Sequence, residues 1–412
     1  MIFRRITPKI LQALKFSPVV LLNGARQTGK TTLVKAIAKE KSFRYVTLDD
    51  LTTLHAAKSD PQGFIAAFDK PLIIDEVQRV PELLLAIKAR VDQSRQPGQF
   101  LLTGSANALM LPKISESLVG RMVILTLFPL SYDEIRGQKN TIIDDLVEQK
   151  INSTQAKEIS KNELFNFILL GGFPELQKLA NEKQKKAWFQ SYISTILQRD
   201  IQDLARINGI FELPRLFSYL GYQAGSLLNL SNLSRELGMP VSTLKRYVTL
   251  LEAIFLVHRL PAWFRNIGKR LIKTPKVFFN DSGLLSHLLG VNAENLESNP
   301  KISGQLFENF IFQELIKQIS WSESQPQLYY FRTAAGKEVD FILETNNGQL
   351  IGIEIKLKET IQSKDFDGLR ELMNLTNGQF KAGYVLSLSK EVVPFGNNLF
   401  TLPLSLFLQG FN

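Results

Sequence analysis

The chain has 412 residues, of which 44% are hydrophobic, and this size suits about two to four domains with cores of their own. It contains no cysteine, which excludes disulfides, thiolate catalysis and cysteine-ligated zinc and predicts a cytoplasmic location. The formal net charge of +10 is unevenly placed. The sequence has no signal peptide and no apolar run of the ~18 residues that a membrane span needs, so we expect no membrane association.

The first informative element is a phosphate-binding motif that follows a predicted strand at residues 19–22. Residues 24–31 read Gly-Ala-Arg-Gln-Thr-Gly-Lys-Thr and match G-x-x-x-x-G-K-[ST]. Residues 32–38 continue with apolar side chains at helical spacing. Strand, glycine turn and helix form the arrangement that binds a nucleotide phosphate, and the alternative is a glycine-rich turn before an ordinary helix. We predict ATP binding by Gly24, Ala25, Arg26, Gln27, Thr28, Gly29, Lys30, Thr31 and Thr32.

Two side chains of this motif and two later acids have predicted roles in ATP hydrolysis. Lys30 brings a positive charge to the β- and γ-phosphates, and the Thr31 hydroxyl can ligate Mg²⁺. An apolar strand at residues 71–74 ends in Asp75 and Glu76. In P-loop ATPases such an Asp holds Mg²⁺ through water, and the next Glu polarises the attacking water. We assign Asp75 to Mg²⁺ and Glu76 to the catalytic base, with a helix N-cap after a strand as the alternative.

The next predicted strand, residues 100–107, ends in polar residues. Ser105 and Asn107 are candidates for contacting the γ-phosphate or the attacking water, and Thr103 is a weaker one. A polar turn between strand and helix is the alternative. Arg121 follows, and it could neutralise charge on a γ-phosphate in cis or from a neighbouring subunit. A surface arginine in a salt bridge is the alternative.

The order of predicted elements divides the chain into four parts and places it in the α/β class. Alternating strands and helices at the start predict a parallel sheet with helices on both faces. Ser131 and Glu134 have the spacing of a capping box, which begins the next helix. The predicted parts are an AAA+-like P-loop ATPase domain at 1–130, a helical lid or linker at 131–215, a winged-helix module at 216–295, and an α/β domain at 296–412.

The winged-helix prediction rests on two helices joined by a glycine-containing turn, at residues 230–238 and 240–251. The wing strands would lie at residues 255–260 and 276–280. Between residues 241 and 280 there are eight basic residues and a single acid, Glu252, a pattern typical of a nucleic-acid-binding face. Protein packing by the module, an acidic partner or simple solubility are the alternatives. We predict DNA binding by Ser242, Thr243, Lys245, Arg246, Lys269 and Arg270, the first four in a major groove.

A last set of charged residues lies in the C-terminal part. Glu308 belongs to an apolar helix, Asp340 to a predicted strand at 338–343, and Glu354 and Lys356 to the next strand. A carboxylate on one strand and Glu-x-Lys on its neighbour can hold Mg²⁺ while the lysine orients a water against a phosphodiester. We predict metal binding by Glu308, Asp340 and Glu354, and catalysis by Asp340, Glu354 and Lys356. A half-buried hairpin with its charges on the wet face is the alternative.

Taken together, the chain resembles prokaryotic ATP-binding proteins that join an AAA+-type ATPase domain to a restriction-endonuclease-like C-terminal module. The resemblance covers nearly the whole chain and implies an ATPase of a kind that can form a ring, with ATP and Mg²⁺ as cofactors. It does not supply a cellular role. Its marks are the P-loop, Asp75-Glu76, residues 102–105, Gly120-Arg121, residues 171–175, residues 273–276, residues 281–284, and the set Asp340, Glu354 and Lys356.

Two functions are compatible with these patterns. The first is a Mg²⁺-dependent ATPase that binds DNA and couples ATP turnover to DNA remodelling or cleavage, with branched DNA as a substrate by fold-level analogy. The second is a nucleotide-controlled switch, in which the nuclease-like centre is inactive and the C-terminal half binds a protein partner. The salt dependence of DNA binding separates the two, since phosphate contacts weaken steeply with salt.

Overall fold

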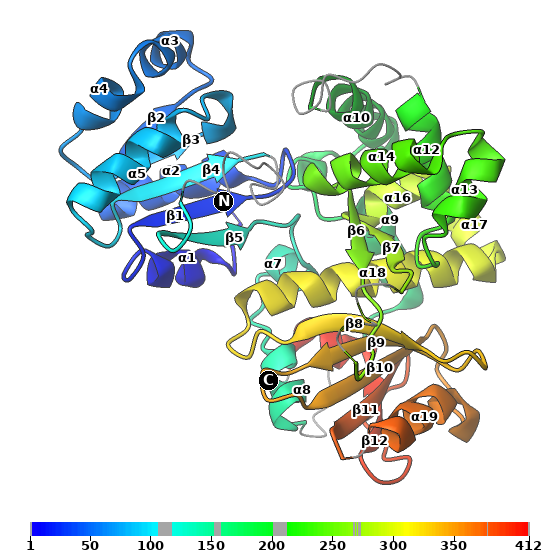
Figure 1. Cartoon of the computed structure of the whole chain (residues 1–412). Coiled ribbons are helices and arrows are strands. Elements are labelled where there is room, and N and C mark those ends of the chain that lie inside the picture. The colour runs from blue at the N-terminus through cyan, green and yellow to red at the C-terminus, as the bar shows by residue number, and fades with distance from the viewer. Residues whose placement is uncertain are drawn as a thin grey trace.

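The computed structural model shows an N-terminal parallel sheet, a helical middle part and a C-terminal mixed sheet (Figure 1). A long helix of the C-terminal part runs beneath the middle helices and along the mixed sheet. The residues described are 2–105, 118–151, 158–200, 212–266, 268, 270, 273–376 and 378–410.

The N-terminal sheet is fully parallel, with the strand order β2-β3-β4-β1-β5. Because parallel strands end at the same edge, the residues that follow β1, β3 and β4 gather there. This edge therefore holds the P-loop, the acids after β3 and the polar residues after β4. The strands are β1 (Val19–Asn23), β2 (Arg44–Thr47), β3 (Leu72–Asp75), β4 (Phe100–Gly104) and β5 (Met122–Thr126).

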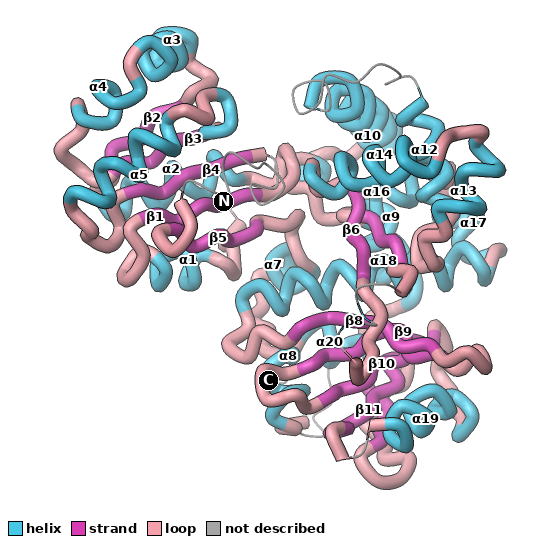
Figure 2. The backbone as a smooth tube through the Cα atoms, in the orientation of Figure 1, coloured by secondary structure: helices cyan, strands magenta, loops and turns pink. Residues whose placement is uncertain are grey.

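Helices cover both faces of this sheet, as the sequence predicts (Figure 2). Side chains alternate along β1: Leu21 packs into one apolar cluster, and Val20 and Leu22 pack into another on the opposite face. The continuous apolar strands of the sequence are thus strands buried on both sides. The helices are α1 (Thr7–Ala13), α2 (Lys30–Lys41), α3 (Leu51–Ser59), α4 (Pro61–Ala66) and α5 (Leu83–Gln93).

The middle part is helical and contains one antiparallel hairpin, β6 (Val257–Leu260) with β7 (Lys276–Phe279). The capping box at Ser131 and Glu134 begins α7, as predicted. The helix pair α13–α14 and the hairpin lie where the sequence predicts them, and their assignment as a winged helix stays a prediction. The helices are α7 (Tyr132–Arg136), α8 (Ile142–Glu148), α9 (Lys161–Leu170), α10 (Glu182–Thr195), α12 (Leu213–Tyr222), α13 (Leu230–Leu237), α14 (Val241–Ala253), α16 (Ser282–Leu288) and α17 (Ala293–Ser298).

The C-terminal sheet is mixed, with the order β12-β11-β10-β9-β8. β8, β9 and β10 are antiparallel neighbours, whereas β10, β11 and β12 run parallel. The predicted strands that carry Asp340 and Glu354 are confirmed as the neighbours β9 and β10. The restriction-endonuclease-like assignment stays a prediction. The elements are α18 (Pro300–Trp321), β8 (Gln327–Arg332), β9 (Glu338–Glu344), β10 (Leu350–Lys356), α19 (Asp367–Leu375), β11 (Phe380–Ser387), β12 (Leu399–Pro403) and α20 (Leu404–Gln409).

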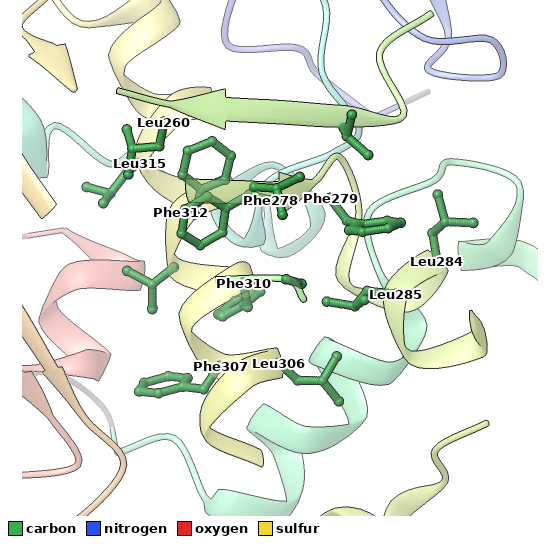
Figure 3. Close-up of a cluster of buried hydrophobic side chains, with 14 of the residues drawn as sticks. Leu260, Phe278, Phe279, Leu284, Leu285, Leu306, Phe307, Phe310, Phe312 and Leu315 are labelled. Atoms are coloured by element: carbon green, nitrogen blue, oxygen red, sulfur yellow. The ribbon is translucent and has the colours of Figure 1, made fainter. Parts of the chain in front are cut away.

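One apolar core joins the middle part to the C-terminal part. α18 contributes Phe307, Phe310 and Phe312 to it. Figure 3 shows Phe312 beside Phe278 of the hairpin strand β7, with Phe310 and Phe307 farther along the helix. The rings of Phe278 and Phe312 stack with centroids 4.2 Å apart. The hairpin and α18 are therefore in direct contact, and a movement of one would shift the other. Among the described helices, none is long and apolar enough to cross a membrane.

Candidate nucleotide site and charged clusters

The turn after β1 has the backbone conformation that a phosphate-binding loop needs. Gly24 has φ +142°, and a Cβ there would lie 2.3 Å from the carbonyl oxygen of Leu127. Gly29 has φ +95° and is the N-cap of α2. Both positions require glycine, because side chains rarely adopt these angles and the first has no room for one. The turn can therefore direct backbone N–H groups at an anion at the start of α2.

Lys30 lies folded over this loop. Its Nζ donates to the carbonyl oxygens of Gly24 and Ala25, at 2.8 Å each, and the residue is buried. The Thr28 hydroxyl donates to the Ala25 carbonyl at 2.9 Å and closes the turn from inside. The structure thus places the predicted residues 24–32 in one compact loop and the first turn of α2.

Asp75 lies at the end of β3, directly beside the loop, and is almost fully buried. Its Oδ2 accepts hydrogen bonds from the hydroxyls of Thr31 and Tyr45, both at 2.8 Å. The Thr103 hydroxyl donates to its other oxygen. Burial, and next the neighbouring Asp75, raise the pKa of Tyr45, so this hydroxyl stays protonated as a donor. The paired oxygens of Thr31 and Asp75 suit Mg²⁺, which prefers hard oxygen ligands.

Glu76 has an unusual backbone, with φ +61° and ψ +44°. A non-glycine residue in this region is strained and is typical of functional sites. Its N–H donates to the Thr103 hydroxyl at 2.9 Å, which helps to hold this conformation. Its carboxylate accepts from the Gln78 amide, which also donates to the Ser105 hydroxyl at 2.9 Å. Sequence reasoning missed Gln78, although it stands only two positions after the acid.

Of the polar residues predicted after β4, Ser105 lies at the site edge, linked to Glu76 through Gln78. The Thr103 hydroxyl contacts both acids at the end of β3: it donates to the Asp75 carboxylate and accepts from the Glu76 N–H. It therefore positions these acids. Asn107 lies outside the described residues.

Arg4 supports the loop from below and was not predicted. Its guanidinium donates to the carbonyl oxygens of Thr28 and Phe128, both at 2.6 Å, and forms an ion pair with Glu134 at 3.1 Å. The side chain is only 8% exposed. All three partners are distant in sequence, so no spacing rule could find this contact.

Arg121 lies at the opposite end of the sheet from the P-loop. It precedes β5, whereas the loop follows Asn23, which pairs with Thr126 at the other end of β5. The five residues of β5 separate the two ends by roughly 16 Å. Its Nε contacts Asp92 at 2.5 Å. The predicted γ-phosphate contact in cis is therefore wrong, and the surface salt bridge is what the structure shows. A contact in trans stays a prediction.

Replacing Arg121 tests this correction. Arg121→Ala is expected to leave ATP turnover in dilute protein within about twofold of the wild type. The residue lies far from the loop, and its exposed ion pair contributes little to stability. Turnover per chain, measured over a range of protein concentrations, checks this. A loss seen only where chains associate would place Arg121 in a neighbouring subunit's site.

The predicted DNA-binding residues divide into two groups. Ser242, Lys245 and Arg246 are exposed near the start of α14, with Thr243 partly buried beside them. Arg270, by contrast, is only 12% exposed at its side chain and forms a bidentate ion pair with Glu344. The DNA contact predicted for Arg270 is therefore wrong, because this guanidinium is committed inside the molecule. Lys269 lies outside the described residues.

The rest of the basic cluster is also partly used within the chain. Arg259 pairs with Glu252, the single acid of the cluster. Lys276 is buried and contacts Glu308 and Glu338. The excess of positive charge seen in the sequence between residues 241 and 280 is therefore larger than the excess on the surface.

The structure brings together the charged residues predicted in the C-terminal part. The Ile355 N–H donates to Asp340 Oδ2 at 2.8 Å, and Lys356 Nζ lies 2.6 Å from Glu354 Oε1. The carboxylates are mostly buried, so the alternative of charges on a wet face does not describe them. Burial raises the pKa of Glu308 to about 7 and that of Glu354 to about 8.

These carboxylates do not form a metal site as they stand. Within the described ranges, no group of three or more acids and histidines is arranged to hold a metal ion. The ammonium group of Lys276, from β7, lies 2.9 Å from Glu308 and 3.9 Å from Asp340 instead. Sequence reasoning missed this lysine as a member of the cluster.

Comparisons with known proteins agree with the N-terminal site. Residues 16–136 match the family model of an AAA domain. Residues 161–295 and 303–407 match two domains of unknown function, DUF8612 and DUF4143. An uncharacterized protein of Mycobacterium tuberculosis is 31% identical over 359 residues, which cover 87% of this chain and 74% of that protein. One of Methanocaldococcus jannaschii is 24% identical over 360 residues, covering 84% and 77%.

Two solved structures are similar at low scores. A Walker-type ATPase of Pyrococcus abyssi has a TM-score of 0.42 and 16% identity over 68% of this chain and 94% of that one. The RuvB Holliday junction branch migration motor of Thermotoga maritima has a TM-score of 0.28 and 22% identity over 62% and 89%. We draw no argument from likenesses this weak.

The AAA-domain match spans the P-loop and the acids after β3, so the N-terminal part is an ATPase domain of the P-loop type. This fold implies nucleotide binding, typically with Mg²⁺. The identity to the mycobacterial protein extends well beyond that domain. The chain therefore belongs to the same family as this protein, with an AAA domain at residues 16–136.

Proposed function

We propose that the protein is a Mg²⁺-dependent ATPase that binds DNA and uses ATP turnover to remodel it. The observation that carries the ATPase part is the convergence of the P-loop, Asp75 and the strained Glu76 at one edge of the parallel sheet. The DNA part is supported by the exposed basic residues of α14.

Each residue of the site has a role in this proposal. The loop N–H groups and Lys30 bind the phosphates, and Thr31 and Asp75 hold Mg²⁺, which would offset phosphate charge. Glu76 orients and polarises the attacking water. Its carboxylate is held by Gln78, which also reaches Ser105, so the base is fixed at the site edge. In this proposal Ser105 contacts the γ-phosphate or the water.

The contacts of the loop offer a path from the nucleotide to the rest of the chain. The Tyr192 hydroxyl of α10 donates to the carbonyl oxygen of Arg26 at 3.3 Å, and Arg4 holds the next part of the loop. α10 in turn packs on α16, where the rings of Phe189 and His287 stack with centroids 5.4 Å apart. A shift of the loop on nucleotide binding would therefore reach the middle helices through α10.

DNA binding is assigned to the start of α14. Ser242, Lys245 and Arg246 are exposed on it, and among the described residues neither basic side chain has an acid within ion-pair distance. Leu244, Tyr247 and Val248 anchor the opposite side of the helix in the core. α14 thus presents a polar, basic face on a rigid element, as a recognition helix does.

Removing both basic side chains tests this assignment. Lys245→Ala with Arg246→Ala is expected to weaken DNA binding and to reduce the slope of log K against log salt by about 2, since each lost phosphate contact contributes about 0.9. Fluorescence anisotropy with linear and branched duplexes at several salt concentrations measures both quantities.

A matched double variant controls for general loss of charge. Lys39→Ala with Lys41→Ala removes two exposed lysines from the end of α2, and it should leave the slope nearly unchanged. If both double variants reduce the slope equally, or neither does, α14 is not the DNA-binding element.

A second candidate function is a nucleotide-controlled switch that binds a protein partner. It is favoured by the internal ion pairs of Arg259, Arg270 and Lys276, which reduce the charge available to DNA. It is also favoured by the Lys276 ammonium inside the C-terminal carboxylate cluster. ATP turnover without salt-dependent DNA binding would support this function over the first.

A further inference from the structure

The carboxylate cluster of the C-terminal part already contains a buried cation. Lys276 is 3% exposed, and its Nζ lies 2.6 Å from Glu338 Oε1, 2.9 Å from Glu308 Oε1 and 3.9 Å from Asp340 Oδ1. Its ammonium also lies 5.7 Å from the centre of the Tyr330 ring. These contacts surround the charge with acids from α18 and β9, while the lysine itself comes from the β6–β7 hairpin.

Around this lysine the cluster has more carboxyl groups than cations. Glu354 stands on β10 beside Asp340, and Lys356 Nζ contacts its Oε1 at 2.6 Å. Its other oxygen, Oε2, is buried and has no hydrogen-bond partner. Buried carboxylates need a cation nearby, because desolvated charge is costly when unpaired. Lys276 supplies that cation for the inner acids.

A divalent metal and this lysine need the same space. A Mg²⁺ ion lies about 2.1 Å from its carboxylate oxygens, and the ammonium lies at hydrogen-bond distance from two of the same acids. Glu308 and Asp340 were predicted from the sequence to share a metal ion. In the structure both carboxylates face the Lys276 ammonium instead. The predicted metal therefore does not fit while Lys276 remains in place.

We infer that Lys276 occupies the cation position of this cluster, keeps divalent metals out, and locks the hairpin to the C-terminal sheet. A metal and Lys276 compete for the same carboxylates, so a metal can enter only if the Lys276 ammonium leaves them. This lock goes beyond the proposed function, because it concerns the predicted nuclease-like centre, and it is independent of ATP turnover and of α14.

Backbone hydrogen bonds hold the strand that carries Lys276. The Leu228 N–H donates to the Pro275 carbonyl and the Gly225 N–H to that of Val277, both at 2.8 Å. In the connection between β6 and β7, the Trp263 N–H donates to the Tyr330 carbonyl at 2.6 Å and ties the chain to β8. Strand β7 is thus fixed on both sides of the lysine.

Space beside the cluster is also limited. A Cβ on Gly225 would lie 2.9 Å from Glu308 Oε2, so the loop after α12 closes directly over this acid. Gly225 has φ +77°, a conformation that favours glycine. A shift of β7 would also move this loop, because the Gly225 N–H is bonded to the Val277 carbonyl.

Metal binding by Lys276→Met tests the inference, because methionine keeps the length of the side chain and removes the charge. Metal-free protein without nucleotide is titrated with Mn²⁺, and bound ion is counted by electron paramagnetic resonance while melting is followed. We expect one added Mn²⁺ site in Lys276→Met and a melting temperature raised by about 2–4 °C. The wild type should show neither change. Lys358→Met, which removes an exposed lysine paired with Asp365, is the matched control.

Two further variants make every outcome decisive. Adding Asp340→Asn to Lys276→Met should remove the new site. A wild-type chain that binds Mn²⁺ here, with binding lost in Asp340→Asn alone, would overturn the inference. If Lys276→Met does not fold, adding Glu308→Gln and Asp340→Asn should restore folding, because the uncompensated charges are gone. Failure of that rescue would also overturn it. No outcome depends on DNA binding or on ATP hydrolysis, so the proposed function stands or falls separately.

Discussion

Glu76→Gln is expected to slow ATP turnover by about 10²- to 10⁴-fold, the usual contribution of a positioned general base. Glutamine keeps the size of the side chain and its ability to bond Gln78, but it cannot polarise a water as a carboxylate does. ATP binding should persist, because the loop at residues 24–31 and Asp75 are unchanged. Phosphate release measures turnover, and a fluorescent ATP analogue measures affinity.

Two companion variants define the result. Lys30→Ala should lose nucleotide binding itself, because the ammonium lies over the loop that holds the phosphates. Glu82→Gln, an exposed acid six positions after the base, should behave as the wild type. Normal turnover in Glu76→Gln would move the catalytic base to another residue at the site edge, and Ser105 would then orient a water without it.

Arg4→Ala is expected to reduce the free energy of unfolding by about 3–5 kcal/mol, as breaking a buried ion pair usually does. The change leaves Glu134 buried without its guanidinium partner, and the carbonyls of Thr28 and Phe128 lose a charged donor. Because Thr28 belongs to the P-loop, ATP affinity should fall as well. Urea unfolding and ATP titration measure the two effects.

An exposed arginine of the same N-terminal part gives the control. Arg44→Ala, on the edge strand β2, should cost well under about 1 kcal/mol, as is typical of surface positions. Arg4→Lys keeps a charge near Glu134 but cannot reach all three acceptors. Its loss of unfolding free energy should therefore lie between those of Arg4→Ala and Arg44→Ala. Equal stabilities of Arg4→Ala and Arg44→Ala would show that the contacts of Arg4 contribute nothing.

The parts of the fold that the sequence predicted are those encoded locally. The P-loop is a continuous motif, and alternating strands and helices determine a parallel sheet whose strands end together. The sequence alone therefore predicted that Asp75, Glu76 and Ser105 lie close to the loop. The capping box at Ser131 and the strand pair that carries Asp340 and Glu354 were found for the same reason.

The parts that were missed depend on contacts between distant segments. Arg4 reaches Glu134 across 130 positions, and Lys276 reaches Glu308 from another element. Arg270 was counted as a DNA contact because its partner, Glu344, lies outside the basic cluster in sequence. Arg121 was misplaced although it stands at the start of a strand, which in a parallel sheet lies at the opposite edge from the loop. A count of charged residues along a sequence does not show which of them form ion pairs within the chain.

The position of β1 inside the N-terminal sheet, between β4 and β5, affects how the chain can fold. β1 is made early, yet its partners β4 and β5 follow about eighty and a hundred positions later. A sheet built from such distant pairings folds slowly, since long loops must close before any pairing forms. During synthesis the P-loop has no neighbour for Gly24 until Leu127 has emerged from the ribosome. We therefore expect refolding to be slow and to be favoured by ATP, which binds only the closed sheet.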